Sequence, residues 1–405
     1  MRLGALLLVS LGAGLVAAIA ACSSSSSSSP SGPTTTADAG GDAGPSTLRV
    51  GQFNLKELAT DKLVTDSNVQ VDSAAEIIGR FAPDFVNINE IQFDLANTPK
   101  TGLPGAPTST KPPSFDHGAQ NAQRLADRIA AKSGVTYSEI IHFFGNSGTY
   151  WKGENPSNSD SFTLRGWGEW PGRFNTAILS KHPILKDEAR VINDFHWSDL
   201  PDNMLAQMKK DTGLELPTGF PLFEKSLNLV PIDVHGQKIW LDLLHPTAPV
   251  YDPSNKYRNH DELHALQLFL ERKLPGVDPL PDGAKFIVIG DFNADPDGDG
   301  DGVPGAIAQI IDLPSLNART FPTGAGNAGK APTENTYLGG CGDTDGGLPA
   351  DPSKSLQLHL DYILPSVTTG SIAGGAVFLP ERGSPDFPLA CHASDHMFTY
   401  VDIKM

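Results

Sequence analysis

Short apolar runs of strand length recur along the chain after residue 46. We predict strands at Leu48–Asn54, Phe85–Ile91, Thr176–Leu179, Lys238–His245, Lys285–Ile289, Leu358–Leu364 and Met397–Ile403. These runs are rich in Val, Ile and Leu, and some are apolar on both faces. That pattern is typical of strands that are covered on both sides.

Between the runs lie segments in which apolar residues recur at spacings of three and four, the pattern of an amphipathic helix. Asn121–Ala131 and Asp261–Leu274 follow this pattern. Ser73-Ala-Ala-Glu76 has the form of a capping box and predicts a helix over Ala74–Phe81. The alternation of strands and helices predicts a layered α/β fold, in which sheet is flanked by helices.

Polar side chains stand at the ends of four predicted strands. Asn54 ends the first run, Glu90 lies near the end of the second, and His245 ends the fourth. Asp291 and Asn293 follow the fifth run closely. Because binding and catalytic sites of layered α/β folds gather at strand ends and in the loops after them, we expect these side chains to share one site.

The first 46 residues differ from the rest of the chain. Residues 1–21 form a charge-poor apolar stretch after Arg2, which predicts an export signal. Its end, Ile19-Ala-Ala-Cys22, resembles the bacterial lipoprotein box, in which the cysteine is lipidated and becomes the first residue. An ordinary cleaved signal and a membrane span of marginal length are the alternatives.

Residues 22–46 are rich in Ser, Pro, Gly, Thr and Ala, and this composition predicts a flexible tether that cannot bury apolar surface. Residues 47–405 contain no further low-complexity linker and no internal repeat, so we predict one domain over this range. The chain as a whole is therefore expected to be exported and anchored to a bacterial membrane through a lipid on Cys22.

Composition narrows the possible partners. The chain has 30 Lys and Arg against 47 Asp and Glu, a net charge of −17, and a pI near 5.0. This balance argues against a broad basic surface for nucleic acid. It leaves room for an enzyme that holds phosphates through a metal ion and a few local cations.

Three cysteines are too few for a disulfide framework. If Cys22 carries a lipid, Cys341 and Cys391 remain, and in an oxidising compartment they are expected to pair. Two buried free thiols are the alternative.

Seven short motifs, in this order along the chain, resemble those of the endonuclease/exonuclease/phosphatase superfamily. They are Phe53-Asn54, Asn89-Glu90, Ala177-Ile-Leu-Ser180, Leu244-His245-Pro246, Gly290-Asp-Phe-Asn293, Leu360-Asp-Tyr-Ile363 and Ser394-Asp-His396. The resemblance implies the deoxyribonuclease I-like fold, a four-layered α/β sandwich of two packed mixed β-sheets flanked by helices. Arg258–Glu262 also resembles a segment of secreted bacterial members.

The resemblance implies a metal-dependent phosphoesterase and assigns roles to residues. Glu90 would be the main metal ligand, with Asn54 and Asp395 completing the metal site. Asp291 would orient the attacking water and partly deprotonate it, and Asn293 would hold a phosphate oxygen.

Two histidines receive roles in the same way. Asp361 would accept a hydrogen bond from His396 and favour its imidazolium form, which donates to the phosphate. His245 would be a second imidazole that donates to the phosphate or to the leaving oxygen.

The donor types indicate which metal is bound. Carboxylate and amide oxygens suit Mg²⁺, Mn²⁺ or Ca²⁺, and the sequence has no Cys/His cluster of the kind that binds zinc. A hard cation would neutralise the phosphate oxygens during hydrolysis.

The chain departs from its relatives before the Ala177 run. Where many relatives have glycine, this chain has Arg173-Phe-Asn175. Arg173 is expected either to contact the substrate phosphate in a bidentate manner or to pair with a carboxylate. Asn175 is a second candidate for substrate contact.

Three further features suggest other chemistry. His260-Asp-Glu-Leu-His264 places two histidines on one helical face, but the zinc-protease pattern needs Glu directly after the first His, where Asp261 stands. We expect this helix start to pack beside the His245 loop.

The acidic segment Asp295, Asp297, Asp299 and Asp301 resembles a calcium loop. An EF-hand starting at Asp295 would need Glu where Ala306 stands, so the complete motif is absent. A structural Ca²⁺ site of another type and a solvated acidic turn are both possible.

The insertion over residues 145–172 is rich in aromatic residues, namely Tyr150, Trp151, Phe162, Trp167 and Trp170. These side chains either form a small core of their own, or are exposed and contact a base or a lipid.

Together these patterns predict a lipid-anchored, exported phosphoesterase whose substrate is a nucleic acid, a phospholipid head group or a small phosphomonoester. A non-catalytic binding protein on the same fold is the alternative from another class. No feature of the sequence indicates a protein partner.

Overall fold

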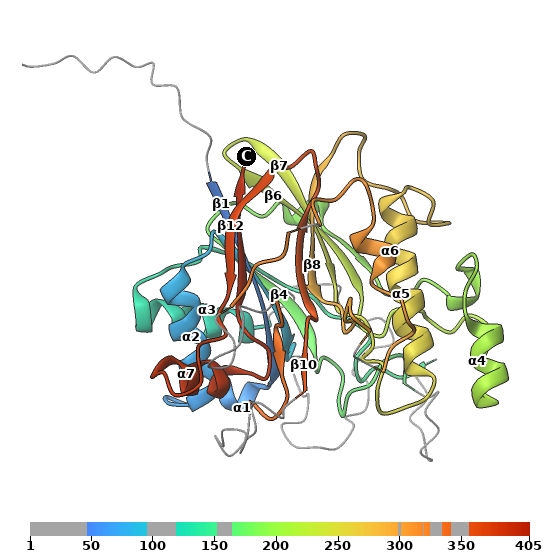
Figure 1. The fold of residues 1–405 in the computed structure, drawn as a ribbon, viewed down its shortest axis with the longest axis horizontal. Coiled ribbons are helices and arrows are strands. Elements are labelled where there is room, and N and C mark those ends of the chain that lie inside the picture. The colour runs from blue at the N-terminus through green and yellow to red at the C-terminus, as the bar shows by residue number, and fades with distance from the viewer. Residues whose placement is uncertain are drawn as a thin grey trace, which may run out of the picture. The chain divides into compact units, whose positions relative to one another are not determined.

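In the computed structural model, two β-sheets pack face to face and helices cover the outer face of each (Figure 1). The structure describes residues 47–94, 119–151, 164–298, 301–318, 320–324, 334–341 and 356–405. These residues lie in one compact unit, Pro45–Met405. The predicted signal (1–21), Cys22 and the predicted tether (22–46) lie outside the described residues.

The first sheet has six strands in the order β12-β13-β1-β2-β4-β3. Their bounds are β1 Thr47–Leu58, β2 Phe85–Ile91, β3 Glu139–His142, β4 Asn175–Ser180, β12 Ser371–Val377 and β13 Thr399–Lys404. β1 and β2 run parallel, and the other neighbours are antiparallel. The sheet is therefore mixed.

The second sheet has five strands in the order β11-β8-β7-β6-β5. Their bounds are β5 Arg190–Ile192, β6 Leu227–Val234, β7 Gln237–Leu244, β8 Lys285–Asp291 and β11 Asp361–Pro365. Only β7 and β8 run parallel within it. A separate two-stranded ribbon pairs β9 (Tyr337–Leu338) with β10 (Gln357–Leu358).

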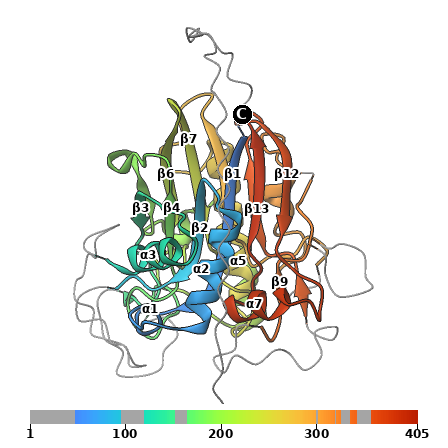
Figure 2. The ribbon, with the colours of Figure 1, turned by 90° about the vertical axis from the view of Figure 1, so that its left-hand side faces the viewer.

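Helices form the two outer layers. The helices α2 (Val69–Phe81), α3 (Asn121–Ser133) and α7 (Asp386–Ala393) lie on the first sheet (Figure 2), next to the short α1 (Thr60–Leu63). The helices α5 (Asn255–Leu270) and α6 (Ala308–Ile311) lie on the side of the second sheet, and α4 (Leu205–Thr212) lies outside them (Figure 1). None of the helices in the described residues is long and apolar enough to cross a membrane.

Three apolar clusters separate the four layers. The central cluster lies between the sheets and includes Val50 and Ile178 of the first sheet and Leu241 and Ile289 of the second. A second cluster joins the first sheet to α2 and α3, and a third joins the second sheet to α5. Both sheets are thus covered on both faces, which confirms the predicted four-layered α/β sandwich.

All seven predicted strands are found, β2 with the predicted bounds and the others with shifted ends. The predicted run Leu358–Leu364 is divided between β10 and β11, and the last predicted run begins as β13 only at Thr399. Sequence inspection missed β6, in which Pro231 interrupts the pattern. The carbonyl of Pro231 points away from β7 and accepts from Leu185 N at 2.9 Å. Its nitrogen points the same way, so the missing N–H costs the β6–β7 ladder no hydrogen bond.

The predicted capping box at Ser73 is wrong. The helix α2 begins at Val69, and its N-cap is Asn68, whose side chain accepts from Val71 N at 3.1 Å. Ser73 is a buried residue within the helix. The helix predicted over Asp261–Leu274 likewise begins earlier, because α5 covers Asn255–Leu270.

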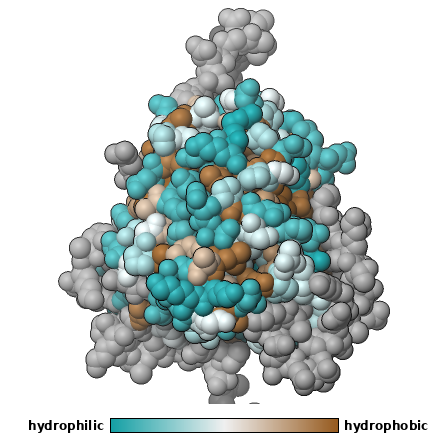
Figure 3. Space-filling model, turned by 90° about the vertical axis from the view of Figure 1, so that its right-hand side faces the viewer, coloured by the Kyte–Doolittle hydropathy of each residue, from teal (hydrophilic) through white to brown (hydrophobic). Residues whose placement is uncertain are grey.

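The face on the side of α4, α5 and α6 is mainly hydrophilic. Figure 3 shows hydrophilic residues over much of the described surface there, with smaller hydrophobic areas between them. This distribution fits an outer helix layer that contacts water.

One buried acid in the second sheet has no hydrogen-bond partner. Asp242 of β7 has 0% exposure, and both carboxylate oxygens lack a partner among the described residues. Burial raises the pKa of Asp242 to about 8, although the charge of Arg190 opposes this shift. The folded protein therefore holds a proton here that the unfolded chain releases near its ordinary pKa of 3.8.

We predict that Asp242→Asn stabilises the protein more at pH 8 than at pH 5. Because the pKa of Asp242 is higher in the folded state, the wild type loses stability as pH rises from about 4 to about 8. The variant does not lose this contribution, so its advantage should grow by roughly 2 to 4 kcal/mol between the two pH values. Urea unfolding at both pH values measures it, and an equal difference at pH 5 and pH 8 would contradict the pKa assignment.

Candidate active site

Parallel strand pairs bring the predicted site residues to one end of the two sheets. Asn54 of β1 and Glu90 of β2 come from the parallel pair of the first sheet. Asp291 ends β8, and His245 directly follows β7, in the parallel pair of the second sheet. Because parallel strands end at the same edge, each pair presents its polar side chains together.

The Asn54 amide joins two carboxylates from different sheets. Asn54 Nδ2 donates to Glu90 Oε1 at 3.0 Å and to Asp291 Oδ2 at 2.8 Å. The other oxygens of the two carboxylates also accept hydrogen bonds, Glu90 Oε2 from Glu57 N and Asp291 Oδ1 from Asn293 N, both at 2.9 Å. The two acids are therefore held in fixed orientations.

His396 is a charged imidazole in this site. Its Nδ1 donates to Asp361 Oδ2 at 2.7 Å, and its Nε2 lies 3.6 Å from Asp291 Oδ2. Burial lowers the pKa of His396, but the carboxylates of Asp361 and Asp291 outweigh it and raise that pKa to about 10. The structure therefore has the Asp361–His396 hydrogen bond that the family resemblance implies.

His245 lies in the same cluster but is neutral. Its Nε2 lies 3.5 Å from Asp291 Oδ2 and 4.0 Å from Glu90 Oε1. Burial, together with the positive charges of Lys225 and His396, holds the pKa of His245 well below its ordinary value. The two imidazoles thus differ in charge at neutral pH.

The two carboxylates and His245 fit a divalent cation. Ligand atoms of Glu90, His245 and Asp291 lie within 4.8 Å of one another. Burial raises the pKa of Asp291 to about 7, and the nearby His396 only partly offsets this, so the carboxylate site needs more positive charge than the side chains supply. A hard cation with oxygen ligands would supply that charge.

A buried amide network, which sequence inspection missed, lies behind these acids. Gln52 Nε2 donates to Asn89 Oδ1 at 2.7 Å and to Asp361 Oδ1 at 3.0 Å. Asn89 Oδ1 also accepts from Asp291 N at 3.2 Å. The network links β1 and β2 of one sheet to β8 and β11 of the other, and so sets the positions of Asp291 and Asp361. The available sequence signal was the presence of three amide residues, Gln52, Asn87 and Asn89, within otherwise apolar predicted strands.

Asp395 lies beside the cluster but is paired with a lysine. Its Oδ2 lies 3.2 Å from Lys56 Nζ, and Ser394 Oγ donates to its Oδ1 at 3.4 Å. The groups of described residues that could hold a metal do not include Asp395. Asp395 lines the same cavity and is neutralised by Lys56, and its role as a metal ligand stays a prediction.

A disulfide connects Cys341 to Cys391. It joins the turn after β9 to α7, directly before the segment that carries His396, and the Cys341 carbonyl accepts from Lys56 Nζ at 3.1 Å. Closing a loop with a sequence separation of 50 stabilises a fold by about 4 kcal/mol in the chain-entropy model. The bridge therefore fixes the segment that carries Asp395 and His396.

Arg173 pairs with carboxylates, which is the second of the two expected outcomes. Its guanidinium lies 2.7 Å from Glu57 Oε2 and contacts Glu169, and it stacks on the ring of Trp170. Asn175 is buried within β4, where its Oδ1 accepts from Gly145 N at 2.6 Å. Neither residue lines the cavity described below, so substrate contact by Arg173 and Asn175 is not supported.

The segment Arg258–Glu262 of α5 holds the loops that form the site. Arg258 donates to the carbonyls of Leu222 and Arg165, and Asn259 Nδ2 donates to Thr247 O at 2.9 Å. The start of α5 therefore packs beside the His245 loop, as expected.

Glu262 connects two of these loops through its two oxygens. Oε1 accepts from Glu224 N and Oε2 from Thr247 N, both at 2.6 Å. The first loop carries Lys225, and the second follows His245. Sequence inspection did not identify Glu262 as a positioning residue, because its partners are backbone groups distant in the chain.

The histidine pair of α5 has no metal-site geometry. His260 Nδ1 contacts Asp261 Oδ1 at 2.8 Å, and His264 Nδ1 contacts Gln267 Oε1 at 3.1 Å. Neither histidine belongs to a possible metal group among the described residues. The described residues therefore give no support for a zinc-protease site here.

The acidic loop after β8 is only partly described. Asp295 accepts from Asp297 N at 2.8 Å and from His359 N at 2.7 Å, so its carboxylate shapes the loop. Asp299 lies outside the described residues, and no group including Asp301 is among the possible metal sites of the described part. A structural Ca²⁺ ion in this loop stays a prediction.

Most of the described aromatic residues in the insertion pack inward. Tyr150 and Trp170 are buried, and Trp151 packs against Phe220 with ring centroids 5.6 Å apart. Trp167 is exposed, and Phe162 lies outside the described residues. Most of these side chains therefore pack inward as one alternative expected, and contact of Trp167 with a base or a lipid stays a prediction.

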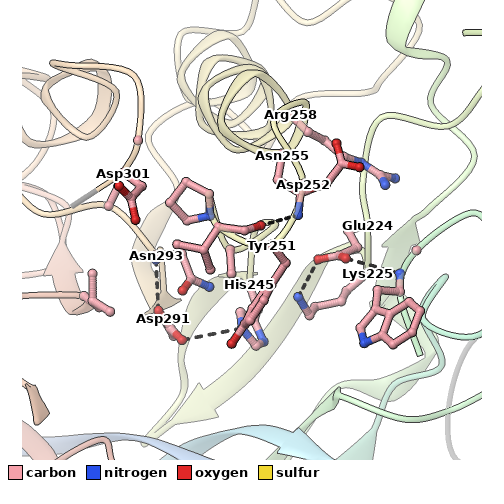
Figure 4. A pocket seen from close by; sticks show the side chains of 18 of the residues that line it. Glu224, Lys225, His245, Tyr251, Asp252, Asn255, Arg258, Asp291, Asn293 and Asp301 are labelled. Carbon is pink, nitrogen blue, oxygen red and sulfur yellow. Dashed lines mark hydrogen bonds and ion pairs between the residues drawn. The ribbon is translucent and has the colours of Figure 1, made fainter. Parts of the chain in front are cut away.

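The cluster opens into a cavity of about 1190 Å³ (Figure 4). Glu90, His245, Asp291, Asn293 and His396 line it together with residues of the surrounding loops. Figure 4 shows the contact between Asp291 and His245 on one side and the ion pair of Glu224 with Lys225 on the other. The catalytic candidates thus face a space large enough for a small organic phosphate ester.

The sequence over residues 51–396 matches the model of the endonuclease/exonuclease/phosphatase family. The chain belongs to this family. Its members are metal-dependent phosphoesterases, and the carboxylate and imidazole cluster lies where the family motifs predict. No curated protein matched the sequence.

Solved structures with a similar fold include an endonuclease/exonuclease/phosphatase from Beutenbergia cavernae (19% identity, covering 89% of this chain and 72% of that chain, TM-score 0.49). Humanized D. rerio TDP2 is 14% identical over 89% of this chain and 99% of its own, with a TM-score of 0.45. Sphingomyelinase C from Streptomyces griseocarneus is 15% identical over 88% and 99%, with a TM-score of 0.46. At these identities the likeness concerns the fold alone.

We predict that Glu262→Gln lowers turnover about tenfold or more and costs about 1 to 3 kcal/mol of stability. The glutamine NH₂ would face one of the two backbone N–H groups, so one loop would lose its acceptor. Loss of kcat at unchanged metal affinity would show that the loops carrying Lys225 and His245 had moved.

Glu76→Gln, on the exposed side of α2, is the matched control and should leave turnover unchanged. Wild-type kcat in Glu262→Gln would contradict the positioning role of Glu262.

Proposed function

We propose that this protein hydrolyses phosphate esters with the help of a divalent cation, preferably Mg²⁺ or Mn²⁺. One observation carries the proposal: the buried Asp291 carboxylate and the half-buried Glu90 carboxylate share the Asn54 amide, and a neutral and a charged imidazole lie within 3.6 Å of Asp291 Oδ2 at one end of the cavity. A fold kept only for binding would not require this combination of charge states.

Glu90 would hold the cation, with Asn54 and Asp291 beside it. When bound, the cation would neutralise the non-bridging phosphate oxygens. All other groups that the reaction needs belong to the chain.

Asp291 acts as the general base. Its pKa of about 7 allows it to accept a proton from water at neutral pH, and the Asn293 N–H fixes its orientation at 2.9 Å. The water oxygen forms a bond to phosphorus, one ester P–O bond breaks, and the departing oxygen takes up a proton from solvent, to which Asp291 returns the proton that it accepted.

His396 stabilises the charge that develops on the phosphate. Its imidazolium, held by Asp361, presents Nε2 toward the cavity side of Asp291. His245 is neutral and has a single N–H to donate, so it contributes a hydrogen bond without a charge.

Asp291→Ala and His396→Ala should each lower kcat by about 10²- to 10⁴-fold while the protein stays folded. A metal-supplemented assay on bis-p-nitrophenyl phosphate, with EDTA as the negative control and circular dichroism for folding, tests this. Asp66→Ala, an exposed loop residue, should behave as the wild type. Full activity in either of the first two variants, or activity that survives EDTA, would refute the proposed roles.

We further propose that the protein is exported and anchored to a bacterial membrane through a lipid on Cys22, because residues 1–21 have the pattern of a signal that ends at a lipoprotein box. Mass spectrometry of the membrane fraction should show a mature chain that begins at a diacylated Cys22. An unacylated, fully soluble mature chain would reject this anchor.

A further inference from the structure

Exposed apolar side chains gather at the mouth of the catalytic cavity. Six large hydrophobic residues among the described ones are exposed, and three of them line this cavity: Trp167 (62% exposed), Tyr251 (98%) and Leu356 (54%). We call these three the rim. They come from three loops that are distant in the sequence, and the fold brings these loops to one cavity.

The backbone turn that carries Tyr251 is fixed by hydrogen bonds. Its backbone has φ of 70°, in the left-handed region that a tyrosine rarely adopts. Asp252 N and Asn255 Nδ2 both donate to Val250 O, at 2.9 and 2.7 Å, and Ser254 Oγ donates to Asp252 Oδ1 at 2.6 Å.

This arrangement costs free energy that no contact among the described residues returns. A left-handed non-glycine residue is strained by about 1 kcal/mol or more, and the ring is left in water. Strain of this kind at a cavity mouth indicates contact with a ligand or another surface.

Tyr251 lines the same cavity as His396. The Tyr337 ring lies edge-on to that of His396, with centroids 5.2 Å apart. All three residues line the cavity. A group bound against Tyr251 is therefore connected to the place where hydrolysis would occur.

The charges of the cavity disfavour a polyanion. Its three lysine and arginine residues are already engaged: Lys56 pairs with Asp395, Lys225 pairs with Glu224 at 2.9 Å, and Arg258 donates to backbone carbonyls. A nucleic acid needs cations for the phosphates on either side of the reacting one.

Three acids that line the cavity are not neutralised in this way. Asp252, Asp295 and Asp301 have no ion pair to a cation in the described part of the chain. Because Asp252 directly follows the exposed Tyr251, this part of the cavity favours a positively charged group, which binds both to carboxylates and to aromatic faces.

We propose that the cavity takes a zwitterionic phospholipid from a membrane surface. The rim enters the head-group layer, where aromatic side chains are favoured. The phosphodiester reaches Glu90 and Asp291, and the ammonium group lies between Tyr251 and Asp252. This inference rests on the proposed phosphoesterase function and adds no co-reactant to it: water bonds to phosphorus and one ester P–O bond of the lipid breaks.

The test uses the full chain with Cys22→Ser in every sample, so that no lipid anchor contributes to binding. Phosphatidylcholine vesicles, phosphatidylglycerol vesicles, single-stranded DNA and soluble bis-p-nitrophenyl phosphate are assayed with Mg²⁺ by ³¹P NMR or absorbance. Vesicle binding is measured separately by sedimentation. We expect phosphatidylcholine to be hydrolysed at least tenfold faster than phosphatidylglycerol or DNA.

The double variant Tyr251→Asn/Trp167→Gln removes both aromatic residues of the rim. Asparagine is chosen at position 251 because it tolerates a left-handed backbone. Its loss of activity on phosphatidylcholine vesicles should exceed its loss on the soluble diester at least tenfold. Val367→Asn is the matched control. Val367 is apolar and as exposed as Leu356 of the rim (both 54%), but it does not line the cavity. It should leave both activities unchanged.

The outcomes separate the two proposals. Hydrolysis of the soluble diester without phosphatidylcholine binding or cleavage, a preference for DNA or phosphatidylglycerol, or equal losses on vesicles and soluble diester would overturn the lipid assignment alone. Absence of hydrolysis of every substrate with Mg²⁺ and with Mn²⁺ would overturn the phosphoesterase function, and the lipid cleavage with it.

Discussion

The contact between the Asn54 amide and the carboxylates of Glu90 and Asp291 is the interaction on which the site depends. The two acids belong to different sheets and repel each other, and the amide donates to both at 3.0 and 2.8 Å. The apolar layer between the sheets cannot set such a position alone, because apolar contacts have no direction. The amide network of Gln52 and Asn89 adds direction, since it ties Asp291 and Asp361 to the first sheet.

Local electrostatics gives the two histidines of the site different charge states. His396 and His245 both lie close to Oδ2 of Asp291. His396 donates a hydrogen bond to the Asp361 carboxylate and is charged. His245 is buried near the positive charges of Lys225 and His396 and is neutral. The catalytic candidates are therefore distinguished by their surroundings. The loops that provide these surroundings are held by buried groups such as Glu262 and by the Cys341–Cys391 bridge.

The sequence was sufficient for the fold class and for the residues at strand ends. A polar residue after an apolar run is a signal that can be read locally in the sequence. Asp361 and His396 were identified from the order of the family motifs. The sequence was not sufficient to find Lys56, which is distant in the chain from its partner Asp395, or to decide whether Arg173 pairs with a carboxylate, because both contacts exist only in three dimensions. The start of α2 was misplaced because Asn68 caps it ahead of a capping box that lies inside the helix.

The most direct test of the central claim is a crystal structure of the protein grown with Mn²⁺, with anomalous scattering recorded at the manganese edge. We predict a single strong peak within about 2.6 Å of a carboxylate oxygen of Glu90, next to Asn54 and Asp291. A peak confined to the Asp295–Asp301 loop, or Glu90 and Asp291 on separate faces of the molecule, would contradict the account.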